Sequence, residues 1–233
     1  MNPMQVAASS VRNRLRAHLG LKLAFAFGLS LWAYGPYFWL QRNPFFPVTV
    51  MTESPLDVWL GFSPSAVWIY LSLFLLMPVA PMQMENRSQL WRYALGVATM
   101  SAVADFIFFF WPTAVARFAD QPASDAYLLL VTWVTPLNAF PSLHAAMAIF
   151  SALCCEQILP QVRHPKICRA ATWTWTVAII WATLSTKEHT ILDAVGGAIL
   201  GLSSYGCAFG SQLLGEKTLR FKGEIIAKEG SRT

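Results

Sequence analysis

The chain has 233 residues, of which 55% are hydrophobic and only 12% are charged. Because a soluble domain carries about 25% charged residues, this composition argues against a soluble protein. The formal net charge of +5 does not by itself indicate nucleic-acid binding, since the positions of basic residues matter more than their sum in a membrane protein. We therefore expect one integral-membrane domain over residues 1–233 and no nucleic-acid partner.

The apolar residues gather into runs, most of which are close to the length that crosses a bilayer. There are six such runs, at about residues 21–40, 58–80, 90–111, 141–159, 171–186 and 189–213. Because the backbone must satisfy its own hydrogen bonds inside a bilayer, we interpret each run as a helix. The predicted fold is an all-α polytopic membrane protein with six transmembrane helices in one bundle and tails at about 1–20 and 214–233.

The basic residues predict how this bundle is oriented. Six helices place both termini on one side of the membrane, and 14 of the 17 basic residues would lie on that side. Arg42, Arg117 and Lys187 would lie on the other side. This bias predicts cytoplasmic termini. The loop at 112–140 would then be external, and residues 127–133 within it would form a short helix along the interface.

Two polar stretches open apolar runs on the predicted external side. The stretch Asn138-Ala-Phe-Pro-Ser-Leu-His144 begins the fourth helix, with Pro141 as its expected first residue. The stretch Ser185-Thr-Lys-Glu-His-Thr-Ile-Leu-Asp193 begins the sixth helix. His189 and Asp193 are four residues apart and share a helix face. We expect Asp193 to accept a hydrogen bond from one ring nitrogen of His189 and to leave the other nitrogen able to attack.

The predicted topology brings His144 and His189 to the same membrane face, each in the first turn of a helix. Two helix N-termini, with Lys187 beside them, suit an anion such as phosphate. One histidine would attack phosphorus and the other would protonate the leaving oxygen. Lys187 and the helix N–H groups would stabilise the charge of the transferring group. We expect no metal or other cofactor; a zinc site on two histidines and an aspartate is the weaker alternative, because a third strong ligand at metal-site spacing is not evident.

These motifs resemble those of a known family. Phe140-Pro-Ser-Leu-His-Ala145 is similar to the second signature of the phosphatidic acid phosphatase type 2 superfamily, and His189-Thr-Ile-Leu-Asp193 is similar to the end of its third signature. The resemblance covers roughly residues 58–213. It implies that His189 forms a phosphohistidine, that Asp193 orients it and that His144 protonates the leaving group. It also implies that Ser142 and nearby backbone N–H groups bind phosphate oxygens.

The chain departs from that family in two places. The first signature, a Lys and an Arg-Pro pair, is not found, and Ser185 stands only four residues before His189, where the family usually has Ser-Arg further upstream. This compact form, with Lys187 in place of an arginine, is similar to the branch that includes inositol phosphorylceramide and sphingomyelin synthases. The stretch Trp111-Pro-Thr-Ala-Val-Ala-Arg117 also resembles a segment of that branch. Arg117 is therefore a candidate phosphate clamp, together with Ser142, Ser185 and Lys187.

The sequence thus predicts a lipid phosphatase or phosphotransferase that acts on a lipid phosphate or diphosphate at the external, periplasmic or lumenal leaflet. The alternative is a transporter or channel in which His144, His189 and Asp193 form a proton relay. Their position at the ends of apolar runs, rather than in the middle of the bilayer, counts against a relay. Neither the lipid headgroup nor the oligomeric state follows from the sequence.

Small residues on the sixth predicted helix indicate close helix packing. Gly197-x-x-x-Gly201 and Gly206-x-x-x-Gly210 both have the spacing that places glycines on one helix face. We expect both motifs to bring a neighbouring helix close.

Overall fold

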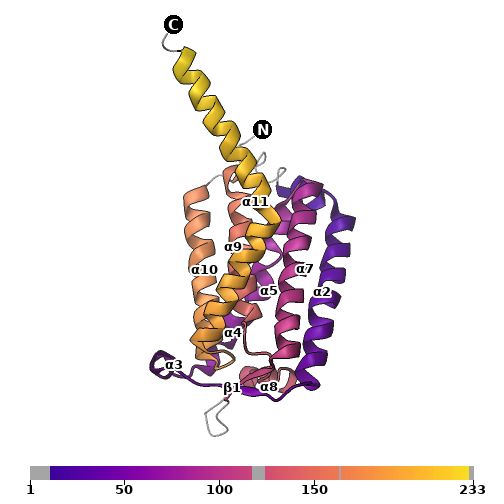
Figure 1. The fold of residues 1–233 in the computed structure, drawn as a ribbon, viewed down its shortest axis with the longest axis vertical. Helices are drawn as coiled ribbons and strands as arrows, with labels where there is room; N and C mark the ends of the chain where they lie inside the picture. Colours follow the sequence, from indigo (N-terminus) through magenta and orange to yellow (C-terminus); the bar gives the residue numbers. More distant parts are fainter. Residues whose placement is uncertain (1–10, 117–123, 163, 231–233) are drawn as a thin grey trace.

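The computed structural model describes residues 11–116, 124–162 and 164–230. Long helices lie side by side in one bundle, as Figure 1 shows. They are α2 (Leu19–Arg42), α7 (Arg87–Phe110), α9 (Leu143–Glu156), α10 (Pro165–Ser185) and α11 (Ile191–Gly230). The mainly helical fold is therefore as predicted. The helix α11 continues through residue 214, where the C-terminal tail was predicted to begin, and ends at Gly230; the boundaries of the two tails stay predictions.

The second predicted helix is divided into short pieces. Residues 64–83, which we call the α4–α6 arm, contain η1 (Pro64–Ala66), α4 (Val67–Leu71), α5 (Leu73–Leu76) and α6 (Val79–Gln83). Proline has no N–H to donate within a helix, and Pro78 and Pro81 both lie near the end of the arm. The hydroxyl of Ser72 donates to the carbonyl oxygen of Ile69 at 2.6 Å, which competes with regular helix bonding. These residues explain why the apolar run does not form one regular helix.

Three segments of the described part of the chain are long and apolar enough to cross a membrane. They are the arm at Pro64–Gln83, then α7 at Arg87–Phe110, and the first part of α11 at Ile191–Gln212. The helix α9 is apolar but has only 14 residues. Half of the six predicted spans thus meet this test among the described residues, and the spans assigned to α2, α9 and α10 stay predictions.

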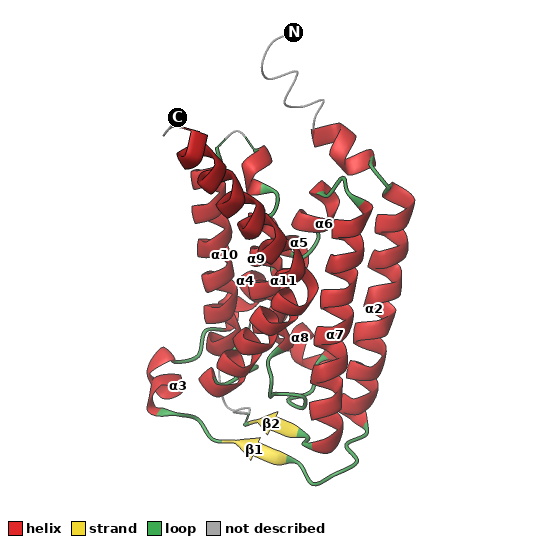
Figure 2. Ribbon diagram, turned by 45° about the horizontal axis from the view of Figure 1, so that its top comes forward, coloured by secondary structure: helices red, strands yellow, loops and turns green. Residues whose placement is uncertain are grey.

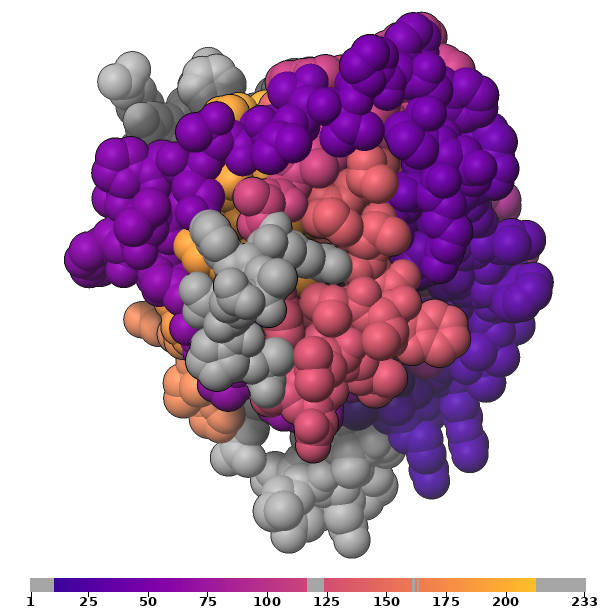
Figure 3. Space-filling model, turned by 90° about the horizontal axis from the view of Figure 1, so that it is seen from below, coloured from indigo at the N-terminus to yellow at the C-terminus, as the bar shows by residue number. Residues whose placement is uncertain are grey.

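The lower end of the bundle in Figure 1 carries the irregular segments. Here β1 (Thr49–Met51) pairs in parallel with β2 (Thr113–Val115), a small sheet that the all-α prediction missed. The helix α3 (Pro55–Leu60) follows β1, and α8 (Asp125–Trp133) confirms the short helix expected near residues 127–133. Figures 2 and 3 show the chain after α2 running along the edge of this end, with the α8 segment beside it. Thr113 of β2 and Asp57 of α3 contact the chain at the starts of α9 and α11.

The helix α9 is the centre of the bundle and packs most closely on α11. A Cβ atom added at Gly197 would overlap the backbone carbonyl oxygen of Ser142, and one at Gly201 would overlap that of Ala146. The first glycine motif therefore does what was predicted, since only glycine permits this backbone approach. The prediction for Gly206-x-x-x-Gly210 is wrong, because a Cβ at either glycine meets no atom of the described residues within 4 Å.

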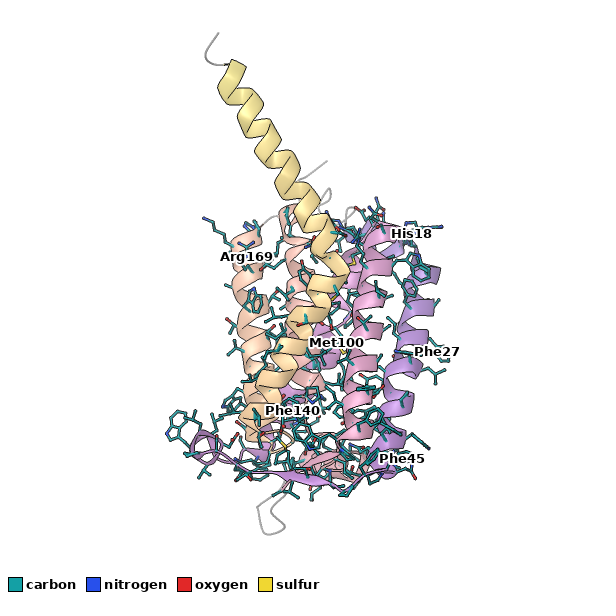
Figure 4. All side chains as sticks on the ribbon, viewed as in Figure 1. His18, Phe27, Phe45, Met100, Phe140 and Arg169 are labelled. Atoms are coloured by element: carbon teal, nitrogen blue, oxygen red, sulfur yellow. The ribbon has the colours of Figure 1, made fainter. Side chains whose placement is uncertain are left out.

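Buried side chains from several helices fill the space around α9. The core includes Met100 of α7, Phe150 of α9, Ile179 of α10 and Phe209 of α11, each fully buried. Met100 is labelled near the middle of the bundle in Figure 4, whereas Phe27 of α2 points away from it. Such outward apolar side chains are expected where a helix faces lipid.

Candidate functional site

The two polar stretches meet at the lower end of the bundle, where α9 and α11 begin (Figure 1). Ser142 is the N-cap residue of α9, and its side-chain oxygen accepts a hydrogen bond from the N–H of Ala145 at 3.3 Å. The backbone N–H of Ser142 donates to the carbonyl oxygen of Asp193 at 2.9 Å. The start of α9 is thus fastened directly to the first turn of α11.

The start of α9 differs from the prediction by two residues. Pro141 was expected as the first helical residue, but the helix begins at Leu143. The reason is the cap: an N-cap residue lies outside the helix, and Ser142 has that role. Pro141 stands before the cap, after a cis peptide bond with Phe140, which Figure 4 labels at the lower end of the bundle.

The two histidine rings face a common space. Their centroids are 6.4 Å apart and the ring planes are inclined by 45°. The ring of His144 stacks on Tyr70 of α4 at 3.9 Å, and its Nδ1 is 3.3 Å from the Tyr70 hydroxyl. Its Nε2 is buried and has no hydrogen-bond partner in the described part of the chain. Tyr70 therefore contacts His144 at the ring face and at Nδ1, and Nε2 has no partner among the described residues.

The hydrogen bond of His189 is not the one predicted. Its Nδ1 lies 2.9 Å from the backbone carbonyl oxygen of Ala139 and 4.0 Å from Oδ2 of Asp193. The second distance is too long for a hydrogen bond. Because a carbonyl oxygen only accepts, this contact places a proton on Nδ1 and the lone pair of the neutral ring on Nε2. One ring nitrogen of His189 thus donates a hydrogen bond, as predicted, but the acceptor is the carbonyl oxygen of Ala139 and not the carboxylate of Asp193.

Asp193 instead organises the turn that carries His189. Its Oδ2 accepts hydrogen bonds from the backbone N–H of Thr190 at 2.6 Å and from the Thr190 hydroxyl at 2.9 Å. The carboxylate is fully buried, and its Oδ1 has no hydrogen-bond partner among the described residues. Asp193 thus makes its hydrogen bonds to Thr190, the residue after His189, and only a longer 4.0 Å contact to the His189 ring.

The strand β2 holds the backbone that contacts His189. Thr113 binds residues 139 and 140: its carbonyl oxygen accepts from the N–H of Ala139 at 3.2 Å, and its hydroxyl accepts from the N–H of Phe140 at 2.7 Å. Asn138 has a positive φ of 60°, a conformation that asparagine tolerates better than most residues. Its side-chain N–H donates to the carbonyl oxygen of Tyr37 at 2.9 Å. Hydrogen bonds of the residues before and after Ala139 therefore hold its carbonyl group in place.

Lys187 contacts two residues from the segment around α3 that the sequence did not indicate. Its ammonium group is buried, 2.5 Å from the carbonyl oxygen of Asp57 and 2.9 Å from Oε1 of Glu53. The Asp57 carboxylate accepts from the N–H of Ile191 at 2.8 Å, at the start of α11. The chain around α3 thus caps α11 and compensates the charge of Lys187. The N-terminus of α11 was predicted to offer N–H groups to an anion, but Asp57 and Asp193 already occupy those of residues 191 and 190.

The remaining predicted phosphate ligands differ in how they are placed. Ser185 is fully buried, its backbone carbonyl oxygen accepts from the N–H of Ser63 at 2.8 Å, and its hydroxyl has no hydrogen-bond partner within the described ranges. Arg117 lies outside the described residues. As for metals, the described residues contain no cluster of three or more His, Cys, Asp or Glu side chains that could bind one.

The sequence reasoning missed Tyr70, Thr113, Ala139, Glu53 and Asp57. Only the Asp57 segment carried a local signal, since Ser54-Pro-Leu-Asp57 has the spacing of a capping box, which α3 indeed has. Its second role at the start of α11 joins residues 134 positions apart, and no local pattern indicates such a contact.

A long cleft reaches the two histidines. Its volume is about 480 Å³, and its lining residues come from α2, the α4–α6 arm, α7, α8 and α9. His144 and His189 lie at one end, and most of the other lining residues are apolar. We call it the α2 cleft. A second cavity of about 400 Å³ lies between α7 and α11 beside Phe140, and neither histidine lines it.

A family model described as the PAP2 superfamily matches residues 50–207, which include both polar stretches. The chain belongs to the PAP2 superfamily. The comparison with curated proteins and the comparison with solved structures gave no match. Membership of the PAP2 superfamily supports a phosphatase-type function, and together with the three apolar spans it indicates a membrane protein.

Proposed function

We propose that this PAP2-superfamily protein is a lipid phosphatase or phosphotransferase that works through a phosphohistidine on His189. The observation that carries the proposal is the histidine pair: two rings 6.4 Å apart, each contacted at Nδ1 by a fixed protein oxygen. In this proposal the two Nε2 atoms act on a group placed between the rings. A nucleophile and a general acid on opposite sides of phosphorus need this arrangement.

The first step begins with the lone pair of His189 Nε2. This nitrogen attacks phosphorus, the N–P bond forms, and the bond from phosphorus to the lipid oxygen breaks. A charged His144 donates its Nε2 proton to that oxygen, while the Tyr70 hydroxyl oxygen accepts from its Nδ1–H. The negative charge of a bound phosphate favours this charged form of His144. The phosphorylated His189 ring keeps its Nδ1 proton, directed at the Ala139 carbonyl oxygen.

The second step regenerates the enzyme. Neutral His144 removes a proton from water, or from the hydroxyl group of an acceptor lipid, as that oxygen attacks phosphorus. The N–P bond breaks and its electron pair returns to His189 Nε2. Water gives hydrolysis and a hydroxyl acceptor gives transfer, so the same site supports both outcomes.

The helix that offers N–H groups to the phosphate is α9. The first N–H groups of a helix have no partner within it, and those at the start of α11 already bind carboxylates. Ser142, Ser185, Lys187 and Arg117 remain the proposed side-chain ligands of phosphate. Since Lys187 contacts Glu53, its ammonium acts on phosphate as part of an ion-pair network. The site lies at the end of the bundle that the basic residues predict to be external.

Purified protein in detergent tests this function with phosphatidate, phosphatidylglycerol phosphate and polyprenyl diphosphate as substrates. We expect phosphate release or headgroup transfer, and a loss of at least about 10³-fold in His189→Ala, since a missing nucleophile leaves only binding effects. His164→Ala, at the other end of the bundle, is the matched control. A ³²P-labelled substrate should leave acid-labile label on the wild-type protein and none on His189→Ala. Full activity in His189→Ala would refute the mechanism, and proton flux in liposomes without turnover would favour the relay.

A further inference from the structure

The helix α2 is attached to the rest of the molecule at both ends and leaves a space between the attachments. Near the histidines, the side chain of Asn138 donates to the carbonyl oxygen of Tyr37 at 2.9 Å. At the other end, the ammonium group of Lys22 donates to the carbonyl oxygen of Met82, just before the end of the α4–α6 arm, at 2.8 Å. The α2 cleft runs between these two bonds, and all four residues line it. The cleft therefore has two defined ends.

The sides of the cleft are apolar and one side faces outward. Along its back, α2 packs on α7, where Trp32 donates to the carbonyl oxygen of Ala98 at 3.1 Å. The residues of α2 that line the cleft recur at helical spacing, so one face of α2 forms a wall of the cleft. Ala26, Ala33 and Tyr37 lie on this face. Phe74 of the arm lines the cleft and is 46% exposed, so it stands at the rim. A hydrocarbon chain can enter sideways past such a rim without crossing water.

The distance between the ends is longer than one leaflet. Lys22 and Tyr37 are 15 residues apart on α2, which corresponds to about 22 Å along a helix. Half of a bilayer's hydrocarbon core is only about 15 Å thick. The cleft volume of about 480 Å³ lies in the range of small-molecule sites. A long, mostly apolar space of this volume fits one extended chain better than a branched pair of chains.

We propose that the α2 cleft binds a single hydrocarbon chain of the phosphate substrate and measures its length against the Lys22–Met82 bond. The proposal rests on the proposed function, because the histidines at one end of the cleft identify its occupant as the chain attached to the reacting phosphate. The cavity between α7 and α11 has a similar volume but does not reach either histidine. A linear alkyl or acyl chain and a prenyl chain share the required chemistry.

Chain-length profiles test this length limit. Single-chain alkyl phosphates and prenyl phosphates of increasing length are compared in wild type, Ala33→Trp, Ala26→Trp and Ala24→Trp. Ala33 is one helical turn from Tyr37 and Ala26 is one turn from Lys22, whereas Ala24 lies outside the cleft lining. We expect Ala26→Trp to lower the ratio of long-chain to short-chain kcat/KM at least tenfold, and Ala33→Trp to move the cut-off to still shorter chains. Ala24→Trp should keep the wild-type profile.

The series whose cut-off moves identifies the chain type. If neither the alkyl nor the prenyl profile of the two cleft variants differs from that of Ala24→Trp, the proposal is overturned. Since a variant can lose all activity by misfolding, a binding measurement supplies a second test.

His189→Ala protein is labelled with a long-chain alkyl phosphate that carries a photoreactive diazirine at the far end of its chain. We expect crosslinks in the part of the cleft near Lys22, Ala26 and Met82. Crosslinks at Val103 or Ile199 of the second cavity, or only on the outward face of α2, would overturn the proposal. Crosslinks in the cleft without any His189-dependent turnover in wild type would instead refute the proposed function, so the two failures are distinguishable.

Discussion

At the scale of single residues, one backbone oxygen and one tyrosine contact the Nδ1 atoms of the two histidines. Ala139 contributes only a carbonyl oxygen, yet that oxygen determines which nitrogen of His189 has the lone pair. Tyr70 contributes a stacked ring and a hydroxyl to His144. A general acid needs both a fixed position and an acceptor for its second N–H. Tyr70 meets both needs, although it lies 74 positions away in the chain.

Removal of the Tyr70 hydroxyl separates these two contributions. Tyr70→Phe keeps the stacked ring but removes the oxygen at His144 Nδ1, so we expect kcat to fall about 10-fold, the worth of one hydrogen bond to a charged group. Tyr70→Leu also loses the stack and should fall further. The substrate KM should change little in Tyr70→Phe, because the hydroxyl acts on His144 and not on the lipid. An unchanged kcat in Tyr70→Phe would contradict the assigned role of this residue.

At the scale of elements, contact between α9 and α11 sets the geometry of the site. Gly197 lies one turn after Asp193, and its missing side chain lets the backbone at Ser142 approach α11. The Ser142 N–H donates to the Asp193 carbonyl oxygen across the same contact. The closest helix packing in the bundle therefore coincides with the junction of the two motifs.

Alanine substitutions at two glycines of α11 should have opposite effects. Gly197→Ala forces a Cβ against the Ser142 carbonyl oxygen, so we expect the free energy of unfolding to fall by about 1–3 kcal/mol. Gly206→Ala meets open space and should raise it by up to about 1 kcal/mol, because alanine favours a helix. Thermal unfolding of both variants in the same detergent measures the difference. Equal shifts would show that α9 and α11 are not in this close contact.

At the scale of the whole molecule, the sequence predicted what is periodic or local and missed what is distant. Apolar runs indicated the helices, because such runs depend on neighbouring residues. The helix face that His189 and Asp193 were expected to share is wrong, since α11 begins at Ile191 and His189 lies in the turn before it. The division of the arm at Ser72 and Pro78 and the contact of Asp57 with Ile191 depend on tertiary packing. The prediction that Asp193 accepts a hydrogen bond from His189 was wrong for the same reason. His189 Nδ1 lies 2.9 Å from the carbonyl oxygen of Ala139 but 4.0 Å from Oδ2 of Asp193, and the sequence does not indicate the contact with Ala139.

The orientation of the bundle is the last property to test, and surface cysteines can report it. Trp59 of α3 is 80% exposed at the end that carries the site, and Lys166 is exposed at the start of α10, at the opposite end. The variants are made with Cys168, the partly exposed native thiol near Lys166, changed to Ser. With Trp59→Cys, a membrane-impermeant maleimide should label intact cells, whereas Lys166→Cys should react only after the membrane is opened. We expect this outcome because the positions of the basic residues predict that the end opposite the site lies in the cytoplasm. The reverse labelling pattern would place the histidines in the cytoplasmic leaflet and restrict the substrate to lipid phosphates made on that side.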